Sequence, residues 1–237
     1  SEDGSVRLWD LASGTCIHPL GRHLNTALCL ATDPRGNWIA SGYINGTISF
    51  WDPGSGARLR HWVAHSDSIF ALAVHPEGVW VASCSEDGTA RLWDPATGEF
   101  LCDLGGHRDA VQSLAVHPKG DWIASGCVGG SISLWNPTTG EPLGTLEGHS
   151  GRLWSLAVHP KGDWIASCSD DGLIRLWDPT SCTLLDELEG LSGRALSLAV
   201  QPQSDWIACG SDDGAIRFWD PASRGCLRTL EERSSQV

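Results

Sequence analysis

Histidines that recur at a fixed spacing are the first residues of this chain that could do chemistry. His75, His117 and His159 lie 42 residues apart, and each stands before a proline. Imidazole is a common metal ligand, so such a series suggests a ring of zinc ligands. Three acidic pairs follow the same spacing and suggest calcium loops, since Ca²⁺ prefers carboxylate oxygens. These pairs are Glu86-Asp87, Asp170-Asp171 and Asp212-Asp213.

A repeat sets the elements that must position these residues. Two series of tryptophans have the same period of 42 residues, without insertion or deletion. One series is Trp9, Trp51, Trp93, Trp135, Trp177 and Trp219, and the other is Trp38, Trp80, Trp122, Trp164 and Trp206. A period of this length indicates a repeat architecture in which each unit packs against its neighbours.

Within one period the pattern is entirely that of β-strands. In residues 65–106, apolar and β-type segments predict strands over 69–74, 80–84, 89–93 and 99–104. The dipeptide Asp87-Gly88 separates two of them and favours a tight hairpin, because both residue types tolerate positive φ. No segment has useful helical periodicity. Four antiparallel strands in about 40 residues are typical of one blade of a β-propeller.

The chain resembles the WD40-repeat family over essentially its whole length. The Gly-His pairs at 106–107 and 148–149 and the Trp-Asp pairs at 51–52, 93–94, 177–178 and 219–220 carry the resemblance. The near-identical repeats are similar in style to bacterial WD40 arrays. The resemblance implies an all-β WD40 β-propeller, here with five complete four-stranded blades and an N-terminal half blade.

The expected domain organisation is a single propeller domain over residues 1–231, with a tail at 232–237. The expected half blade is 1–20, and the expected full blades are 21–63, 64–105, 106–147, 148–189 and 190–231. We expect this to be the C-terminal part of a longer array. The alternative is a closed ring of six blades, one of them half empty.

The resemblance also implies a hydrogen-bonded tetrad in each blade: the His of Gly-His, a Ser or Thr of the second strand, the Asp of the next turn and the Trp of the third strand. Two blades have the complete set. These tetrads are His65, Ser83, Asp87 and Trp93, and His149, Ser167, Asp171 and Trp177. We expect both to be structural.

The other three blades depart from the tetrad pattern, and we expect them to be less well tied. The first has His23, Ser41 and Trp51, with Asn45 in place of the Asp. The third has His107, Ser125 and Trp135, with Gly129 in place of the Asp. The fifth keeps Asp213 and Trp219 but has Leu191 and Cys209 in place of the His and the Ser.

A Ser-His-Asp group also suggests a hydrolase, but the pattern favours a structural role. The trio recurs in two blades, whereas an active site is expected once, and a G-x-S-x-G motif is absent from the sequence. Equivalent points on adjacent blades are expected roughly 10 Å apart, too far to share a zinc ion whose ligands lie about 2 Å away. The acidic pairs lack the six or more oxygens of a calcium site. We therefore expect no enzyme activity, metal site or cofactor.

The net charge narrows the kinds of partner, and the cysteine content bears on the cellular compartment. The formal net charge is −13 and the pI is about 4.9, which disfavours nucleic acid as a partner. No apolar run approaches the roughly 20 residues of a membrane helix. The nine cysteines contain no C-x-x-C pair, and we expect buried, reduced thiols in a cytoplasmic protein.

Partners of WD40 proteins often dock on the top face, at the start of the innermost strand and beside the tetrad Asp. By register, the inner-strand positions are Leu28, Phe70, Gln112, Trp154 and Leu196. Two residues earlier stand Ser68, Arg152 and Arg194, and the acidic set is Glu2, Glu86, Asp170 and Asp212. The inner-strand positions vary while the structural ones barely change, as a reader of peptides requires. The alternative is that Phe70 and Trp154 merely pack between blades.

These observations favour a protein–protein interaction scaffold or sensor, part of a larger signalling protein, with a protein or peptide of basic character on its top face. An architectural or engineered repeat array without a dedicated partner is the alternative. A propeller hydrolase is less favoured.

Overall fold

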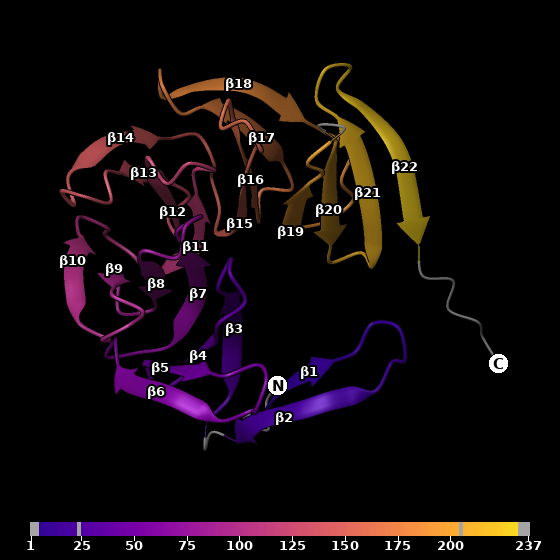
Figure 1. Ribbon diagram of the computed structural model, residues 1–237. Coiled ribbons are helices and arrows are strands. Elements are labelled where there is room, and N and C mark those ends of the chain that lie inside the picture. Colours follow the sequence, from indigo (N-terminus) through magenta and orange to yellow (C-terminus); the bar gives the residue numbers. More distant parts are fainter. Residues whose placement is uncertain (1–4, 23–24, 204–205, 232–237) are drawn as a thin grey trace.

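The computed structural model describes residues 5–22, 25–203 and 206–231, and every regular element in this part of the chain is a β-strand. Figure 1 shows the strands gathered into sheets that follow one another around a common axis. Five sheets have four antiparallel strands and one has two. The all-β propeller architecture predicted from the sequence is therefore confirmed.

The two-stranded sheet comes first in the chain and is followed by five blades. The half blade contains β1 (Ser5–Trp9) and β2 (Cys16–Arg22). The first blade contains β3 (Ala27–Thr32), β4 (Ile39–Tyr43), β5 (Thr47–Trp51) and β6 (Arg58–Val63). The second contains β7 (Ile69–Val74), β8 (Val81–Ser85), β9 (Ala90–Trp93) and β10 (Phe100–Leu104). The third contains β11 (Val111–Val116), β12 (Ile123–Cys127), β13 (Ile132–Trp135) and β14 (Pro142–Leu146).

The fourth and fifth blades repeat this plan. The fourth contains β15 (Leu153–Val158), β16 (Ile165–Ser169), β17 (Ile174–Asp178) and β18 (Thr183–Leu188). The fifth contains β19 (Ala195–Val200), β20 (Ile207–Ser211), β21 (Ala215–Asp220) and β22 (Gly225–Glu231). Within each blade the strands pair in chain order, with the first strand nearest the axis and the last on the outside (Figure 1). The division into one domain and a tail stays a prediction, and residues 232–237 lie outside the described part.

Local hydrogen bonds explain where the strands of the second blade differ from expectation. The innermost strand β7 has the predicted bounds, whereas β8 begins after Trp80. The Trp80 carbonyl accepts the His75 N–H at 3.0 Å, which makes Trp80 part of the preceding turn. Strand β9 begins after Thr89, because the Thr89 N–H is directed at the Asp87 carboxylate (3.0 Å). In that hairpin only Gly88 has positive φ, at 79°.

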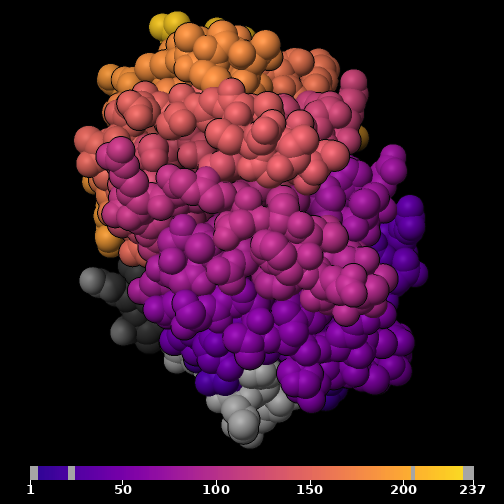
Figure 2. All heavy atoms as spheres, turned by 90° about the vertical axis from the view of Figure 1, so that its left-hand side faces the viewer, coloured from indigo at the N-terminus to yellow at the C-terminus, as the bar shows by residue number. Residues whose placement is uncertain are grey.

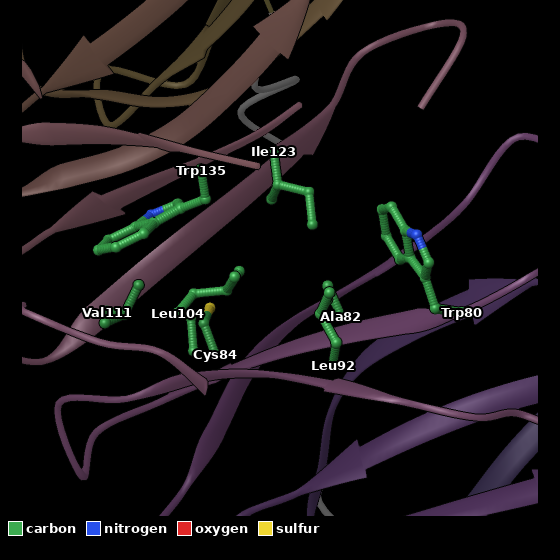
Figure 3. Packing of buried hydrophobic residues seen from close by; sticks show 9 residues of the cluster. Trp80, Ala82, Cys84, Leu92, Leu104, Val111, Ile123 and Trp135 are labelled. Atoms are coloured by element: carbon green, nitrogen blue, oxygen red, sulfur yellow. The ribbon is translucent and has the colours of Figure 1, made fainter. Parts of the chain in front are cut away.

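The apolar core lies between neighbouring blades. Figure 3 shows one cluster formed by side chains from the second blade and from the third. Its labelled members are Trp80, Ala82, Cys84, Leu92, Leu104, Val111, Ile123 and Trp135. A space-filling view shows the successive blades as contiguous bands (Figure 2). No sheet can bury both faces alone, so the stability of each blade depends on its neighbours.

The second and fourth blades contain the hydrogen bonds of the implied tetrads. In the second, His65 Nδ1 lies 3.0 Å from Asp87 Oδ2, and His65 Nε2 lies 2.7 Å from Ser83 Oγ. The Trp93 indole N–H donates to the same Ser83 oxygen at 2.8 Å. Because the carboxylate requires a proton on Nδ1, Nε2 accepts from the Ser83 hydroxyl, and the bonds form a directed relay.

The fourth blade repeats this relay with one addition. His149 Nδ1 lies 2.8 Å from Asp171 Oδ2, and Ser167 Oγ lies 2.7 Å from both His149 Nε2 and the Trp177 indole nitrogen. Arg175 also donates to the Asp171 carboxylate, at 2.7 Å. Although burial opposes ionisation, the hydrogen bonds to Asp171 hold its pKa at about 2.

The three incomplete blades show different local solutions. In the first, Ser41 Oγ accepts from Trp51 at 2.8 Å and donates to the phenol oxygen of Tyr43, a fully buried residue that sequence reasoning missed. His23 lies outside the described residues. In the third, His107 Nε2 lies 2.6 Å from Ser125 Oγ, which also accepts from Trp135. In the fifth, the buried indole nitrogen of Trp219 has no hydrogen-bond partner among the described residues, because Cys209 replaces the serine.

The ring of sheets is not closed. In the described part of the chain, the half blade β1–β2 shares no sheet with the fifth blade, and Figure 1 shows the two separated. The alternative of a closed six-blade ring is therefore wrong for this structure.

All nine cysteines are free thiols. Cys84, Cys127, Cys168 and Cys209 are buried as expected, but Cys16 and Cys226 are exposed. Both exposed thiols lie on the outermost strands, where one face of the strand meets water.

We predict that Asp87→Ala and Asp213→Ala destabilise the protein unequally. Loss of the Asp87 carboxylate leaves the buried His65 Nδ1–H without its acceptor, at a cost of about 1–3 kcal/mol. Asp213 accepts the Ala215 N–H and pairs with Arg217, but Leu191 stands where the other blades have the histidine, so its loss costs less. Urea unfolding of the two variants measures the difference, and equal shifts of the midpoint would contradict the structural assignment of the tetrad.

We also predict that acid destabilises the protein in two stages. Burial lowers the pKa of His65, His107 and His149 below 6.5, so the unfolded chain binds protons first and stability falls as the pH drops below about 6.5. Hydrogen bonds outweigh burial and hold the pKa of Asp87 at about 2, so its contribution is complete above 3.8 and is lost as the pH falls towards 2. Urea midpoints measured from pH 8 to pH 3 test this; a midpoint that stays constant between pH 7 and pH 5 rules out the first stage.

Candidate functional site

The top face is defined here as the end of the propeller where the innermost strands begin. The turns between the second and third strands lie at the same end. Backbone hydrogen bonds show this: the N–H of Glu86 donates to the carbonyl of Ser68, that of Asp170 to Arg152, and that of Asp212 to Arg194, at 2.9–3.1 Å.

A β-bulge positions each of the five inner-strand candidates. Each is the second residue of its innermost strand, and in every blade the strand register shifts at that residue. These residues are Leu28, Phe70, Gln112, Trp154 and Leu196. A bulge leaves one residue outside the ladder and re-aims its side chain. In each blade, therefore, the bulge turns one variable side chain out of the regular alternation of the strand.

Three of these side chains meet around Arg152. Its guanidinium carbon lies 4.5 Å from the centre of the Trp154 ring and 5.8 Å from that of Phe70. Its Nε donates to Gln112 Oε1 at 3.1 Å, and a second hydrogen bond joins Nη2 to the same oxygen. Cation–π contact and the amide thus hold one arginine between the second, third and fourth blades. We call these four residues the arginine cluster.

The arginine cluster continues into a chain of polar contacts across the fourth and fifth blades. The Trp154 indole N–H donates to Asp170 Oδ1 at 2.7 Å, and Arg194 Nη1 lies 3.8 Å from the same oxygen. Arg194 Nε donates to Asp212 Oδ2 at 2.8 Å, and this hydrogen bond lowers the pKa of Asp212. Seven of the twelve top-face candidates therefore form one contiguous group.

The remaining candidates lie outside this group. Leu28 and Leu196 are 42% and 37% exposed, and Glu86 is exposed without a side-chain contact among the described residues. Ser68 is buried, since its hydroxyl donates to the Ile44 carbonyl at 3.2 Å, so it is not available to a partner. Glu2 lies outside the described residues.

The charge of the border differs from the expected acidic rim. Asp170 and Asp212 both lie against Arg194, whose single positive charge offsets one of their two negative charges. Register in the sequence locates these carboxylates. Whether an arginine pairs with them depends on how far its side chain reaches across the neighbouring blade.

Trp154 both packs between blades and contributes to the top face. It is partly buried and packs against the core between the fourth and fifth blades. The Arg152 guanidinium also lies over its ring. Removing it therefore disturbs packing as well as the top face.

The suggested metal and catalytic groups have structural explanations. The described residues contain no group of three or more His, Cys, Asp or Glu side chains able to hold a metal. His75 packs against Gly120 of the next blade, where an added Cβ would lie 2.1 Å from its Nε2, and His117 packs on Gly162 in the same way. Ser83 is fully buried and shared by an imidazole and an indole, so it cannot reach a substrate.

A belt of exposed aliphatic residues on the outermost strands was missed by the sequence reasoning. Each is the second or third residue of its strand, and each is 44–58% exposed. They are Ile17, Leu59, Leu101, Leu143, Leu185 and Leu227. Their 42-residue spacing is the signal that could have found them.

These sheets, turns and hydrogen bonds define a WD40-type β-propeller. A protein-family model described as the IFT122 first beta-propeller matches residues 1–237, so the chain belongs to that family. Comparison with curated proteins gives no significant match. Propellers of this type are generally protein-interaction modules without enzymatic activity. No helix among the described residues is long and apolar enough to cross a membrane.

We predict that Trp154→Ala lowers the free energy of unfolding by about 2 kcal/mol, less than the roughly 3–5 kcal/mol typical of a tryptophan in a core. The smaller value follows from its partial exposure. Trp177→Ala is the matched control, because Trp177 is 1% exposed. Chemical denaturation compares them, and an equal loss at both positions would show that Trp154 is a core residue only.

Proposed function

We propose that this propeller binds a segment of a partner protein on its top face, centred on the arginine cluster. The observation that carries the proposal is the set of five β-bulges, which present unlike side chains from otherwise near-identical blades. A purely architectural array has no need of this variation at the one position that the bulges re-aim.

The composition of the cluster supports a binding role. Aromatic and arginine side chains are enriched among residues that dominate interface energies. Phe70, Trp154 and Arg152 are all partly exposed and already held by their neighbours, so little conformational entropy is lost when a partner docks.

A partner segment of basic character fits the overall electrostatics. The chain carries a net charge of −13, which attracts cations over long range and raises their association rate. Glu86 adds an unpaired carboxylate at the edge of the face. The Arg194 pairs reduce the local acidity, so steering by the whole chain contributes more than the border itself.

The proposal also covers the cellular compartment and the larger protein to which the propeller belongs. Free thiols support a reducing compartment such as the cytoplasm. The family resemblance supports a role as the sensor or scaffold part of a larger signalling protein.

Peptides selected from a displayed random library against the purified chain test the proposal. We predict that Phe70→Ala and Arg152→Ala each weaken the selected peptide by about 30-fold, corresponding to about 2 kcal/mol. Lys161→Ala is the matched control, since this exposed residue lies in the turn after the innermost strand, away from the top face. For a basic peptide, the association rate falls as salt increases.

Unchanged affinity in both top-face variants would place the binding surface elsewhere. Loss of binding in Leu101→Ser with retention in Phe70→Ala would assign the outer aliphatic belt instead.

A further inference from the structure

A cavity of about 600 Å³ opens beside the tetrad position of the third blade. Its walls include His107, Arg108, Gly129, Ser131, Ser133 and Thr145. These residues belong to the third blade. Asp109 and Glu147 of the same blade and Gly148 and His149 of the fourth blade also line the cavity. None is part of the arginine cluster, so the cavity is a separate feature of the fold.

Comparison with the fourth blade explains the cavity. There, Arg175 fills the equivalent space and lies 2.7 Å from Asp171 and 2.6 Å from Glu187. The second blade places Arg91 and Asp103 at the same positions, beside the tetrad residue Asp87.

In the third blade all three positions carry small residues. Gly129, Ser133 and Thr145 stand 42 residues before Asp171, Arg175 and Glu187. The cavity therefore occupies the space that an ionic cluster fills in the second and fourth blades. The third blade lacks those side chains but keeps the surrounding backbone.

The groups that bind a carboxylate remain in place. The Nδ1 atom of His107 is buried without a hydrogen-bond partner of good geometry in the described structure, although the Leu104 backbone stabilises the protonated ring. In the second blade, the equivalent carboxylate of Asp87 also accepts the N–H of Ser66 (3.1 Å) and that of Thr89 (3.0 Å). Arg108 and Ser131 occupy these two positions in the third blade, and both line the cavity.

We propose that this cavity binds a carboxylate group supplied from outside the chain, at the place that Asp87 and Asp171 occupy in their own blades. The bound carboxylate accepts from His107 Nδ1–H and from the backbone N–H groups of Arg108 and Ser131. Its source is either a small free carboxylate or an acidic side chain of a partner.

The electrostatics of the site permit this ligand. Asp109 leans over the cavity, with its Oδ2 2.7 Å from where a Cβ of Gly129 would lie. In the second blade, Asp67 stands at the equivalent position and coexists with the ionised Asp87, whose pKa is about 2. The carboxylates of Asp87 and Asp171 are only 8% and 9% exposed, so this place is largely shielded from water in their own blades.

The test uses the intact, ¹⁵N-labelled chain and follows the imidazole resonances of His107 by NMR at pH 7. Sodium acetate is titrated against sodium chloride at equal ionic strength. We predict a saturable shift of the His107 signals to the Nδ1–H tautomer, together with a rise in melting temperature, with acetate alone. Capped Gly-Gly-Asp-Gly-Gly and its Asn counterpart distinguish a partner side chain from a small carboxylate: response to the Asp peptide assigns the former, and response to acetate only assigns the latter.

Two variants make the outcome specific. Gly129→Asp supplies the carboxylate within the chain, so it abolishes the acetate response, and Asp87→Gly creates the same response at His65. No His107 shift with any carboxylate, or an acetate shift that persists in Gly129→Asp, overturns the proposal. The proposal is also overturned if Asp109→Ala destabilises the protein as strongly as Asp87→Ala. That result would mean that Asp109 already accepts the hydrogen bond from His107. These readouts do not involve the top-face peptide, so they are independent of the proposed function.

Discussion

Apolar packing between neighbouring sheets is the interaction on which the rest of this structure depends. Each blade is too thin to enclose a core, and clusters such as the one in Figure 3 draw residues from two blades. The two tryptophan series recur at 42 residues because every interface needs the same large side chains in the same places. Polar groups at these interfaces must then be paired within the chain, which is why the relays from tryptophan to aspartate are buried.

This constraint explains how much the sequence could predict. Strand order and the bounds of β7 follow from periodicity and turn residues alone. The hydrogen bonds of His65 and His149 follow from register, because the backbone that carries them is repeated without change. Tyr43 was missed because its phenol replaces a partner that the repeat pattern assigns to another residue.

The candidate site was harder to predict because its contacts cross blades. Register gave the five inner-strand positions, but not the β-bulges that aim them. Nor does spacing show that Arg152 reaches back to Phe70 and Gln112, or that Arg194 pairs with Asp170 and Asp212. Long side chains choose among several neighbours, and that choice depends on local shape rather than on a repeated pattern.

A periodic scaffold makes its departures from the period informative. When every blade has the same backbone, a missing side chain leaves either a collapsed space or a cavity with its polar lining intact. The fifth blade shows the first kind of loss, since Leu191 and Cys209 are apolar and pack within the interface. The third blade shows the second, since Gly129 and Ser133 leave His107 facing open space. A buried nitrogen without a partner costs about 1–3 kcal/mol. Water or a ligand that donates to or accepts from that nitrogen recovers part of this energy, and only an acceptor reproduces the relay that the second and fourth blades use.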